Sequence, residues 1–207
     1  MTDATAINKK PRTASEKFAE AVRILSAPPM VALYLMLILW FGNTGVFVDT
    51  ASFVVSIVCL FVLPFLAYPI HAAIPKLRAK GRDLQRKMAF AFNLVGYIAF
   101  GIYAYATYQT PLYRTYALTY VFTVVILTIV NKAFKFKASG HAATATSPAT
   151  YLAPFYAPAS VILGIAFLIL VAWSSLKMKR HTLSQFIGGI IIYLFSFGLA
   201  YLIAVVL

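Results

Sequence analysis

The sequence predicts an all-α membrane protein, a polytopic bundle of transmembrane helices, and two features of its composition carry this prediction. Of its 207 residues, 62% are hydrophobic and only 11% are charged, and a mean hydropathy of +0.85 exceeds what the surface of a water-soluble domain carries. The 18 Lys and Arg residues, against 5 Asp and Glu, lie in clusters between long apolar runs. The net charge of +13 therefore describes orientation in a membrane, and we expect no nucleic-acid partner.

Residues 1–28 form a polar N-terminal segment. The basic residues at 9–12 are followed by polar residues rather than by an apolar core, so we expect no signal peptide. Residues 13–26 place Phe18, Val22 and Leu25 on one helical face, with a capping box at the start and a Pro-Pro pair as the stop. This pattern predicts an amphipathic helix that lies in the membrane interface.

Residues 29–207 are expected to form a single transmembrane domain. A helix needs about 20 apolar residues to cross the hydrocarbon core of a bilayer. Runs of suitable length and composition occur at 30–48, 51–70, 88–108, 115–131, 139–154, 158–174 and 184–206. The run at 139–154 is rich in Ala, Ser and Thr, which favours a short helix buried inside the bundle. About seven spans follow, or six if this run does not cross.

The basic residues predict the orientation. With seven spans, the N-terminal segment and the loops at 71–87, 132–138 and 175–183 fall on one side, and together they hold every Lys and Arg except Arg114. The positive-inside rule then places that side, including the N-terminus, in the cytoplasm, in a multi-pass protein of the cell membrane. The basic loop at 71–87 is expected to contact anionic lipid headgroups.

The sequence predicts no metal and no other cofactor. The single cysteine, Cys59, lies in an apolar run and offers neither a disulfide nor a zinc site. The five carboxylates are too dispersed to form the acidic clusters that hold magnesium in aspartate-rich prenyltransferases.

Two histidines are the leading candidates for chemistry. His141 and His181 are separated by the length of two antiparallel spans, so both should lie at the same membrane surface. No carboxylate is expected near them, whereas six cations are: Lys132, Lys135, Lys137, Lys177, Lys179 and Arg180. This pattern predicts an anion site, with structural interfacial histidines as the alternative.

Phosphate suits such a site. Ser139 and Gly140 directly precede a helix, where unpaired backbone N–H groups and the helix dipole favour an anion. A neutral imidazole can attack phosphorus while a protonated one donates to the leaving oxygen, and neither role needs a metal.

Ser139-Gly140-His141 and the segment around His181 resemble the type 2 phosphatidic acid phosphatase superfamily over about residues 88–207. The Ser-Gly-His motif at a helix start is present, and His181 and Ser174 occupy the histidine and serine positions of the motif Ser-Arg, five residues, His, three residues, Asp. Ser175 replaces the arginine of that motif, and Gln185 replaces its aspartate. The family's first motif is absent, and the segment 131–137 resembles a variant of it with Asn and Lys. The residues at 179–189 resemble a prokaryotic branch.

The resemblance implies a lipid phosphatase that hydrolyses a phosphate monoester or diphosphate, with phosphatidic acid or an isoprenyl diphosphate as substrate. It implies that His181 is the nucleophile that forms a phosphohistidine and that His141 is the general acid. The remaining site residues are Ser139 and Gly140 for the phosphate cradle, Lys137, Lys177, Lys135 and Arg180 as cations, and Gln185 to orient His181. On a continuous helix Lys177, His181 and Gln185 would share one face, whereas a break in the loop would end that register.

Other functions stay open at this point. The residues at Ser175 and Gln185 also fit a non-catalytic protein that binds or translocates phospholipid, because Gln185 cannot stabilise an imidazolium by charge. A lipid phosphotransferase would use the same site with an acceptor other than water.

Overall fold

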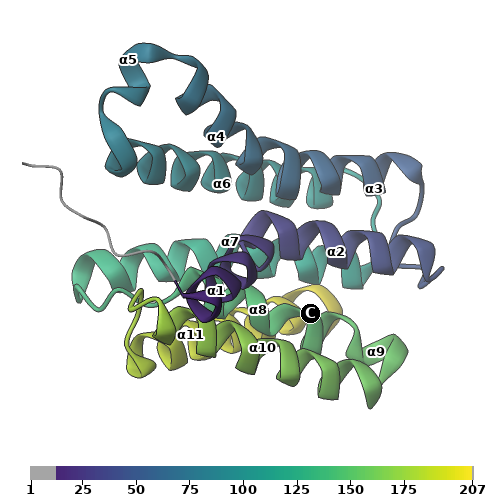
Figure 1. Cartoon of the computed structure of the whole chain (residues 1–207). Coiled ribbons are helices and arrows are strands. Elements are labelled where there is room, and N and C mark those ends of the chain that lie inside the picture. Colours follow the sequence, from purple (N-terminus) through teal and green to yellow (C-terminus); the bar gives the residue numbers. More distant parts are fainter. Residues whose placement is uncertain (1–12, 207) are drawn as a thin grey trace, which may run out of the picture.

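The computed structural model describes residues 13–206, which fold as a bundle of helices without a strand in that range (Figure 1). The first half holds α1 (Ala14–Leu25), α2 (Pro28–Phe41), α3 (Thr50–Ile57), the π-helical turn η1 (Val58–Val62), α4 (Leu63–Ala73), α5 (Pro75–Arg78) and α6 (Gly81–Ala106). The second half holds α7 (Pro111–Ala133), α8 (Gly140–Tyr151), α9 (Ala153–Tyr156), α10 (Ala159–Lys177), α11 (Leu183–Tyr201) and a second π-helical turn, η2 (Leu202–Val206).

Within the described residues, five helical segments are long and apolar enough to cross a membrane. They are Thr50–Ala73, Asp83–Ala106, Pro111–Ala133, Ala159–Lys177 and Leu183–Val205. A sixth arises if α1 and α2, which meet at 60°, count as one bent span. The all-helical fold is confirmed, whereas the count of seven spans and the orientation of the N-terminus stay predictions, because α2 and α8 have only 14 and 12 residues.

Helix α8 lies inside the bundle, in contact with α2, α10 and α11. Its small side chains permit this position, as the composition of 139–154 predicted: Ala142, Ala143 and Ala145 are completely buried. On the facing helix α10, a Cβ at Gly164 would overlap the backbone of Ala149, so this pair allows the close approach of the two backbones.

Aromatic residues join α8 to α7. The rings of Tyr116 and Tyr151 stack with centroids 3.9 Å apart, and the Tyr116 hydroxyl donates a 2.7 Å hydrogen bond to the Tyr151 carbonyl. Both side chains are fully buried, so the hydrogen bond acts in a region that excludes water.

The amphipathic helix predicted for residues 13–26 is α1, and its capping box between Thr13 and Glu16 is present. The helix packs along α10 and buries Ala19 and Val22. Phe18 and Leu25, which were expected on the same apolar face as Val22, are each more than half exposed. The face of α1 that is buried against the rest of the protein is therefore narrower than the apolar face that Phe18, Val22 and Leu25 define.

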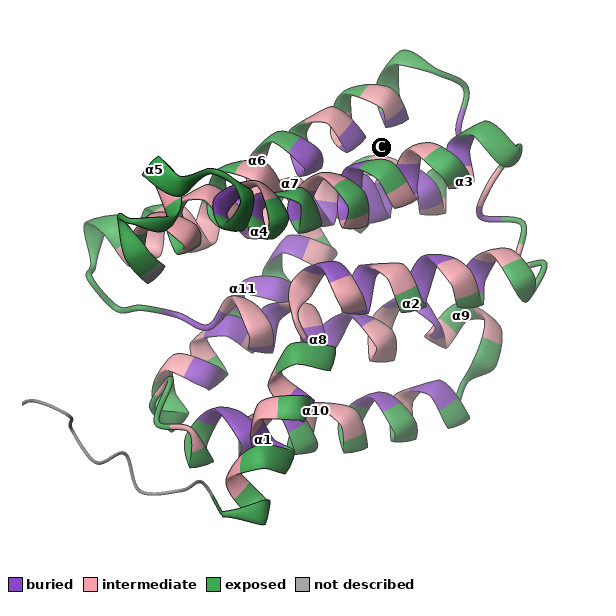
Figure 2. Cartoon of the chain, turned by 45° about the horizontal axis from the view of Figure 1, so that its top comes forward, coloured by how far each residue is buried: buried purple, intermediate pink, exposed green. Residues whose placement is uncertain are grey.

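Basic residues gather at one end of the bundle, which holds α1, α5 and the loops between α7 and α8 and between α10 and α11 (left in Figure 1). Figure 2 shows that α5 and its flanking loop are largely exposed. In the described part of the chain, every Lys and Arg except Arg114 belongs to this end. Arg114 lies in the first turn of α7, at the opposite end, over the ring of Tyr105. The predicted basic cluster at 9–12 lies outside the described residues.

Candidate functional site

The loop that precedes α8 is held in place by a side chain of α7. Asn131 accepts a 2.5 Å hydrogen bond from the Ala138 N–H and donates one of 3.2 Å to the Ala138 carbonyl. The Ser139 N–H then donates a 3.0 Å bond to the backbone carbonyl of Gln185. The start of α8 is thereby tied to both α7 and α11.

Two predicted site lysines lie in this loop, and both have left-handed backbone conformations. Lys135 has a φ of 52° and Lys137 one of 60°, values that non-glycine residues adopt only when the surroundings require it. The hydrogen bonds of Asn131 and of the Ser139 N–H hold the two ends of the loop in place and so impose these backbone conformations. Both lysine side chains are exposed, so they lie on the surface that an approaching anion meets first.

Ser139 is the N-cap of α8. Its buried hydroxyl accepts a 3.3 Å hydrogen bond from the Ala142 N–H, so the side chain is engaged in capping the helix. Any role of this segment toward an anion therefore belongs to the backbone N–H groups of the first turn, beginning at Gly140, and not to the serine hydroxyl.

Two glycines of α11 allow that helix to lie against the loop. A Cβ at Gly189 would overlap the Ser139 carbonyl oxygen, and a Cβ at Gly188 would overlap the ring of Phe136. Only the absence of a side chain lets α11 reach this distance. The pair Gly188-Gly189 thus sets the position of the Ser139-Gly140-His141 segment.

His181 lies in the loop between α10 and α11, next to the N-cap of α11. Thr182 and Gln185 form a capping box, in which Gln185 Oε1 accepts from the Thr182 N–H at 3.1 Å and the Thr182 hydroxyl accepts from the Gln185 N–H at 3.3 Å. The Gln185 side chain also lies near the His181 imidazole and acts to raise its pKa, against the larger lowering by burial. The structure therefore brings Gln185 and His181 together, as predicted.

Of the two arrangements open for Lys177, His181 and Gln185, a shared helical face or a register broken by the loop, the structure has the broken register. Helix α10 ends at Lys177 and α11 begins at Leu183, and the turn between them includes Lys179 with a φ of 50°. A single helical register cannot continue through a residue in that conformation. Lys177 and Arg180, both predicted as phosphate-binding cations, have exposed side chains on this turn.

His141 in the first turn of α8 and His181 in the loop before α11 lie within range of each other's charge, and their pKa values are lowered. Burial lowers the pKa of His141 to about 4, the nearby Arg23 charge and then His181 add to the shift, and a hydrogen bond with the Arg23 backbone opposes it. Burial also lowers the pKa of His181, against hydrogen bonds with the Gln185 side chain and the Lys137 backbone. Both shifts favour the neutral form of the imidazole.

Three nitrogen atoms at this site are buried and have no hydrogen-bond partner among the described residues. They are His141 Nε2, His181 Nδ1 and Arg23 Nε. Buried polar atoms of this kind raise the free energy of the folded state unless a ligand or a water molecule satisfies them. An oxyanion is one ligand that can satisfy buried nitrogen atoms of this kind.

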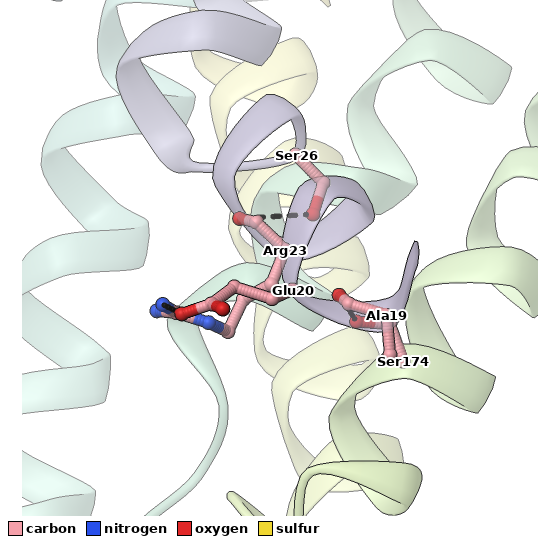
Figure 3. Close-up of polar contacts among 5 residues, drawn as sticks. All are labelled: Ala19, Glu20, Arg23, Ser26 and Ser174. Atoms are coloured by element: carbon pink, nitrogen blue, oxygen red, sulfur yellow. Dashed lines mark hydrogen bonds and ion pairs between the residues drawn. The ribbon is translucent and has the colours of Figure 1, made fainter. Parts of the chain in front are cut away.

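Arg23 is a site residue that the sequence reasoning missed. Helix α1 folds back so that the Ser174 hydroxyl of α10 donates a 2.6 Å hydrogen bond to the Ala19 carbonyl (Figure 3). Arg23, one turn further along α1, is near enough to His141 for its charge to lower the pKa of that imidazole. The Arg23 guanidinium also lies 4.0 Å from the Glu20 carboxylate. No pattern in the sequence indicates that α1 docks on α10 rather than on lipid.

Among residues 13–206, no three His, Cys, Asp or Glu side chains gather into a group that could hold a metal ion.

The chain matches no family model, no curated protein and no solved structure. The function therefore has to be argued from the residues of the site itself.

Proposed function

We propose that the protein is an integral membrane phosphatase that removes phosphate from a lipid phosphate monoester or diphosphate. The observation that carries this proposal is the meeting of His141 and His181, each with a buried, unpartnered ring nitrogen among the described residues, beside the Arg23 guanidinium. Imidazoles and guanidinium are the groups that metal-free phosphoryl transfer requires. In the proposed orientation the site faces the cytoplasm.

The proposed reaction has two steps. In the first, the lone pair of neutral His181 attacks phosphorus, the bond from phosphorus to the lipid oxygen breaks, and His141 gives its proton to that oxygen. In the second, water attacks the phosphohistidine, His141 takes a proton from it, and phosphate leaves His181. The general-acid role needs a protonated His141, and the negative charge of a bound phosphate raises the pKa of an adjacent imidazole and so supplies that state.

The cations take separate parts in binding. Arg23 lies beside His141 and offers the planar, two-pronged donor set that suits a phosphate. The Glu20 carboxylate, 4.0 Å away, partly balances the charge of Arg23. Lys137, Lys177, Lys135 and Arg180 are exposed and attract the headgroup to the membrane surface. The first-turn N–H groups of α8, at Gly140, complete the cradle.

A second candidate, a lipid-binding protein without turnover, is favoured by Gln185. Its side-chain oxygen is already engaged by the Thr182 N–H, and an amide cannot stabilise the imidazolium by charge as a carboxylate does. Such a protein would bind the lipid phosphate at the same site without hydrolysing it.

Phosphate release in detergent micelles tests the proposal. Phosphatidic acid and a polyprenyl diphosphate are offered, with EDTA present, to the wild type and to His181→Ala and His141→Ala. His71→Ala is the matched control, because His71 hydrogen-bonds with the Gly81 carbonyl on a different loop. The proposal expects release by wild type and control and at least a thousandfold loss in both site variants, on the scale typical of removed catalytic groups.

If the wild type binds these lipids and releases no more phosphate than the site variants, the second candidate replaces the first. Transfer of labelled phosphate to an added alcohol, in preference to water, would instead identify a lipid phosphotransferase.

A further inference from the structure

A cavity of about 120 Å³ lies between α6, α7, α8 and α11, next to the candidate site. Its lining is mostly apolar and includes Gly140, the residue directly before His141. A Cβ at Gly140 would meet no atom within 4 Å, so the backbone there is open to the cavity. Gly140 thus belongs both to this lining and to the Ser139-Gly140-His141 segment of the candidate site.

Three polar atoms of the cavity lining are buried and have no hydrogen-bond partner among residues 13–206. They are Asn93 Oδ1 on α6 and the hydroxyls of Tyr120 and Thr123 on α7. Asn93 uses its amide nitrogen to donate to the Ala89 carbonyl at 2.7 Å, which leaves only the oxygen available. Tyr120 is 94% buried, since its relative exposure is 6%.

Other hydroxyls in the same lining are already satisfied. Thr119 donates to the Thr115 carbonyl at 2.7 Å, and Thr144 donates to the Gly140 carbonyl at 3.0 Å. Only some polar atoms of the lining are therefore unsatisfied. Two belong to Tyr120 and Thr123, which share one face of α7, and the third belongs to Asn93 on α6.

The chemistry of these atoms restricts the occupant. An amide oxygen is only an acceptor, so Asn93 Oδ1 requires an O–H or N–H donor, whereas the two hydroxyls can both donate and accept. A bare hydrocarbon chain provides none of these partners and would leave all three atoms unsatisfied. A hydroxylated segment can therefore satisfy these three atoms, whereas the apolar remainder of the lining makes no such demand.

We propose that this cavity, which we call the hydroxyl pocket and define by Asn93, Tyr120 and Thr123, binds a free hydroxyl carried next to the phosphate-bearing carbon of a lipid. The inference rests on the proposed function in that it places the phosphate at His141 and His181. It adds a choice of substrate: glycerol-type lipid phosphates with a free hydroxyl are preferred over prenyl phosphates, whose chains have no such group.

The test uses two lipids that differ in one hydroxyl: 1-oleoylglycerol 3-phosphate and its 2-deoxy analogue. Because a site built to bond a hydroxyl discriminates strongly against the analogue without it, we expect the wild type to prefer the hydroxylated lipid by at least about tenfold in kcat/KM. Tyr120→Phe and Thr123→Val should each reduce that preference severalfold. Thr119→Val is the matched control and should keep it, because its hydroxyl lines the same pocket but is already bonded.

A second readout does not depend on turnover. Thermal stabilisation of the detergent-solubilised protein is measured with 1-oleoylglycerol and with its 2-deoxy analogue. Greater stabilisation by the hydroxylated lipid, lost in Tyr120→Phe and kept in Thr119→Val, supports the pocket even if no phosphate is released.

Phosphate release without any preference between the two lipids would leave the phosphatase intact and overturn the pocket, which then holds water only. Absence of both release and differential stabilisation would overturn both proposals.

Discussion

The Ser174 hydroxyl of α10 donates a 2.6 Å hydrogen bond to the backbone carbonyl of Ala19 in α1, a residue 155 positions away in the sequence. Both residues are completely or almost completely buried. Beside this bond, the rings of Phe18 and Trp173 lie 5.7 Å apart. This contact fixes α1 on α10 and positions Arg23 at the histidines.

Removal of that hydroxyl should loosen α1. The change Ser174→Ala leaves the buried Ala19 carbonyl without its partner, at a cost of about 1 to 3 kcal/mol. We expect trypsin to cleave at Lys17 and Arg23 at least fivefold faster in micelles. Ser196→Ala is the control, because that buried hydroxyl bonds within its own helix, to the Ile192 carbonyl. Equal cleavage of both variants would show that Ser174 does not hold α1.

Arg23 should act on substrate binding. Arg23→Gln removes the guanidinium beside His141, and a charge-assisted bond to phosphate contributes about 1.5 to 3 kcal/mol, so we expect KM to rise by about tenfold or more. Lys17→Gln is the matched control, because it removes one positive charge from an exposed position on the same helix. An equal rise in KM for both variants would mean that Arg23 acts only through the general surface charge.

Gly189 should be required for the shape of the site. Gly189→Ala introduces a methyl group that overlaps the Ser139 carbonyl oxygen, and the start of α8 must shift. Because displacement of a catalytic group by about 1 Å costs about a hundredfold in rate, we expect a loss of that order in kcat. Gly198→Ala on the same helix is the control, since a Cβ there meets no atom within 4 Å. Full activity of Gly189→Ala would contradict the proposed site geometry.

Thermal stability should depend on pH through His141. Burial lowers the pKa of His141 to about 4 in the folded protein, whereas an unfolded histidine titrates near 6.5. Between about pH 4 and 6.5 the unfolded state binds more protons than the folded state. The free energy of unfolding is therefore unaffected by His141 above about pH 6.5 and decreases as the pH falls toward about 4. The apparent melting temperature of the wild type should therefore fall more steeply over this interval than that of His141→Gln. Parallel curves would show that His141 is not held neutral.

Much of the fold was accessible from the sequence because a bilayer imposes long apolar helices with charges at their ends. The helical segments at 50–73, 83–106, 111–133, 159–177 and 183–205 follow from hydropathy alone. The count of spans does not, because the lengths of α2 and α8 depend on the Pro and Gly residues around them and on what they pack against.

The histidine pair was predictable because two antiparallel spans return the chain to the same surface. The sequence left open whether the helix breaks after Lys177, because the break depends on a left-handed Lys179, a conformation that residue type does not signal. The docking of α1 through Ser174 and Ala19 could not be predicted either, because no pattern in the sequence indicates that a given serine hydroxyl will bond to a distant backbone carbonyl. Arg23 was missed for that reason.

The most direct test of the phosphohistidine mechanism is to trap the intermediate. The protein is mixed with lipid labelled with ³²P in its terminal phosphate, quenched in alkaline denaturant, which preserves a phosphohistidine, and mapped by peptide mass spectrometry. We predict label on His181 in the wild type and in the His71→Ala control, and no label in His181→Ala. Phosphate release by a protein that carries no label on His181, or carries it on another residue, would contradict the mechanism.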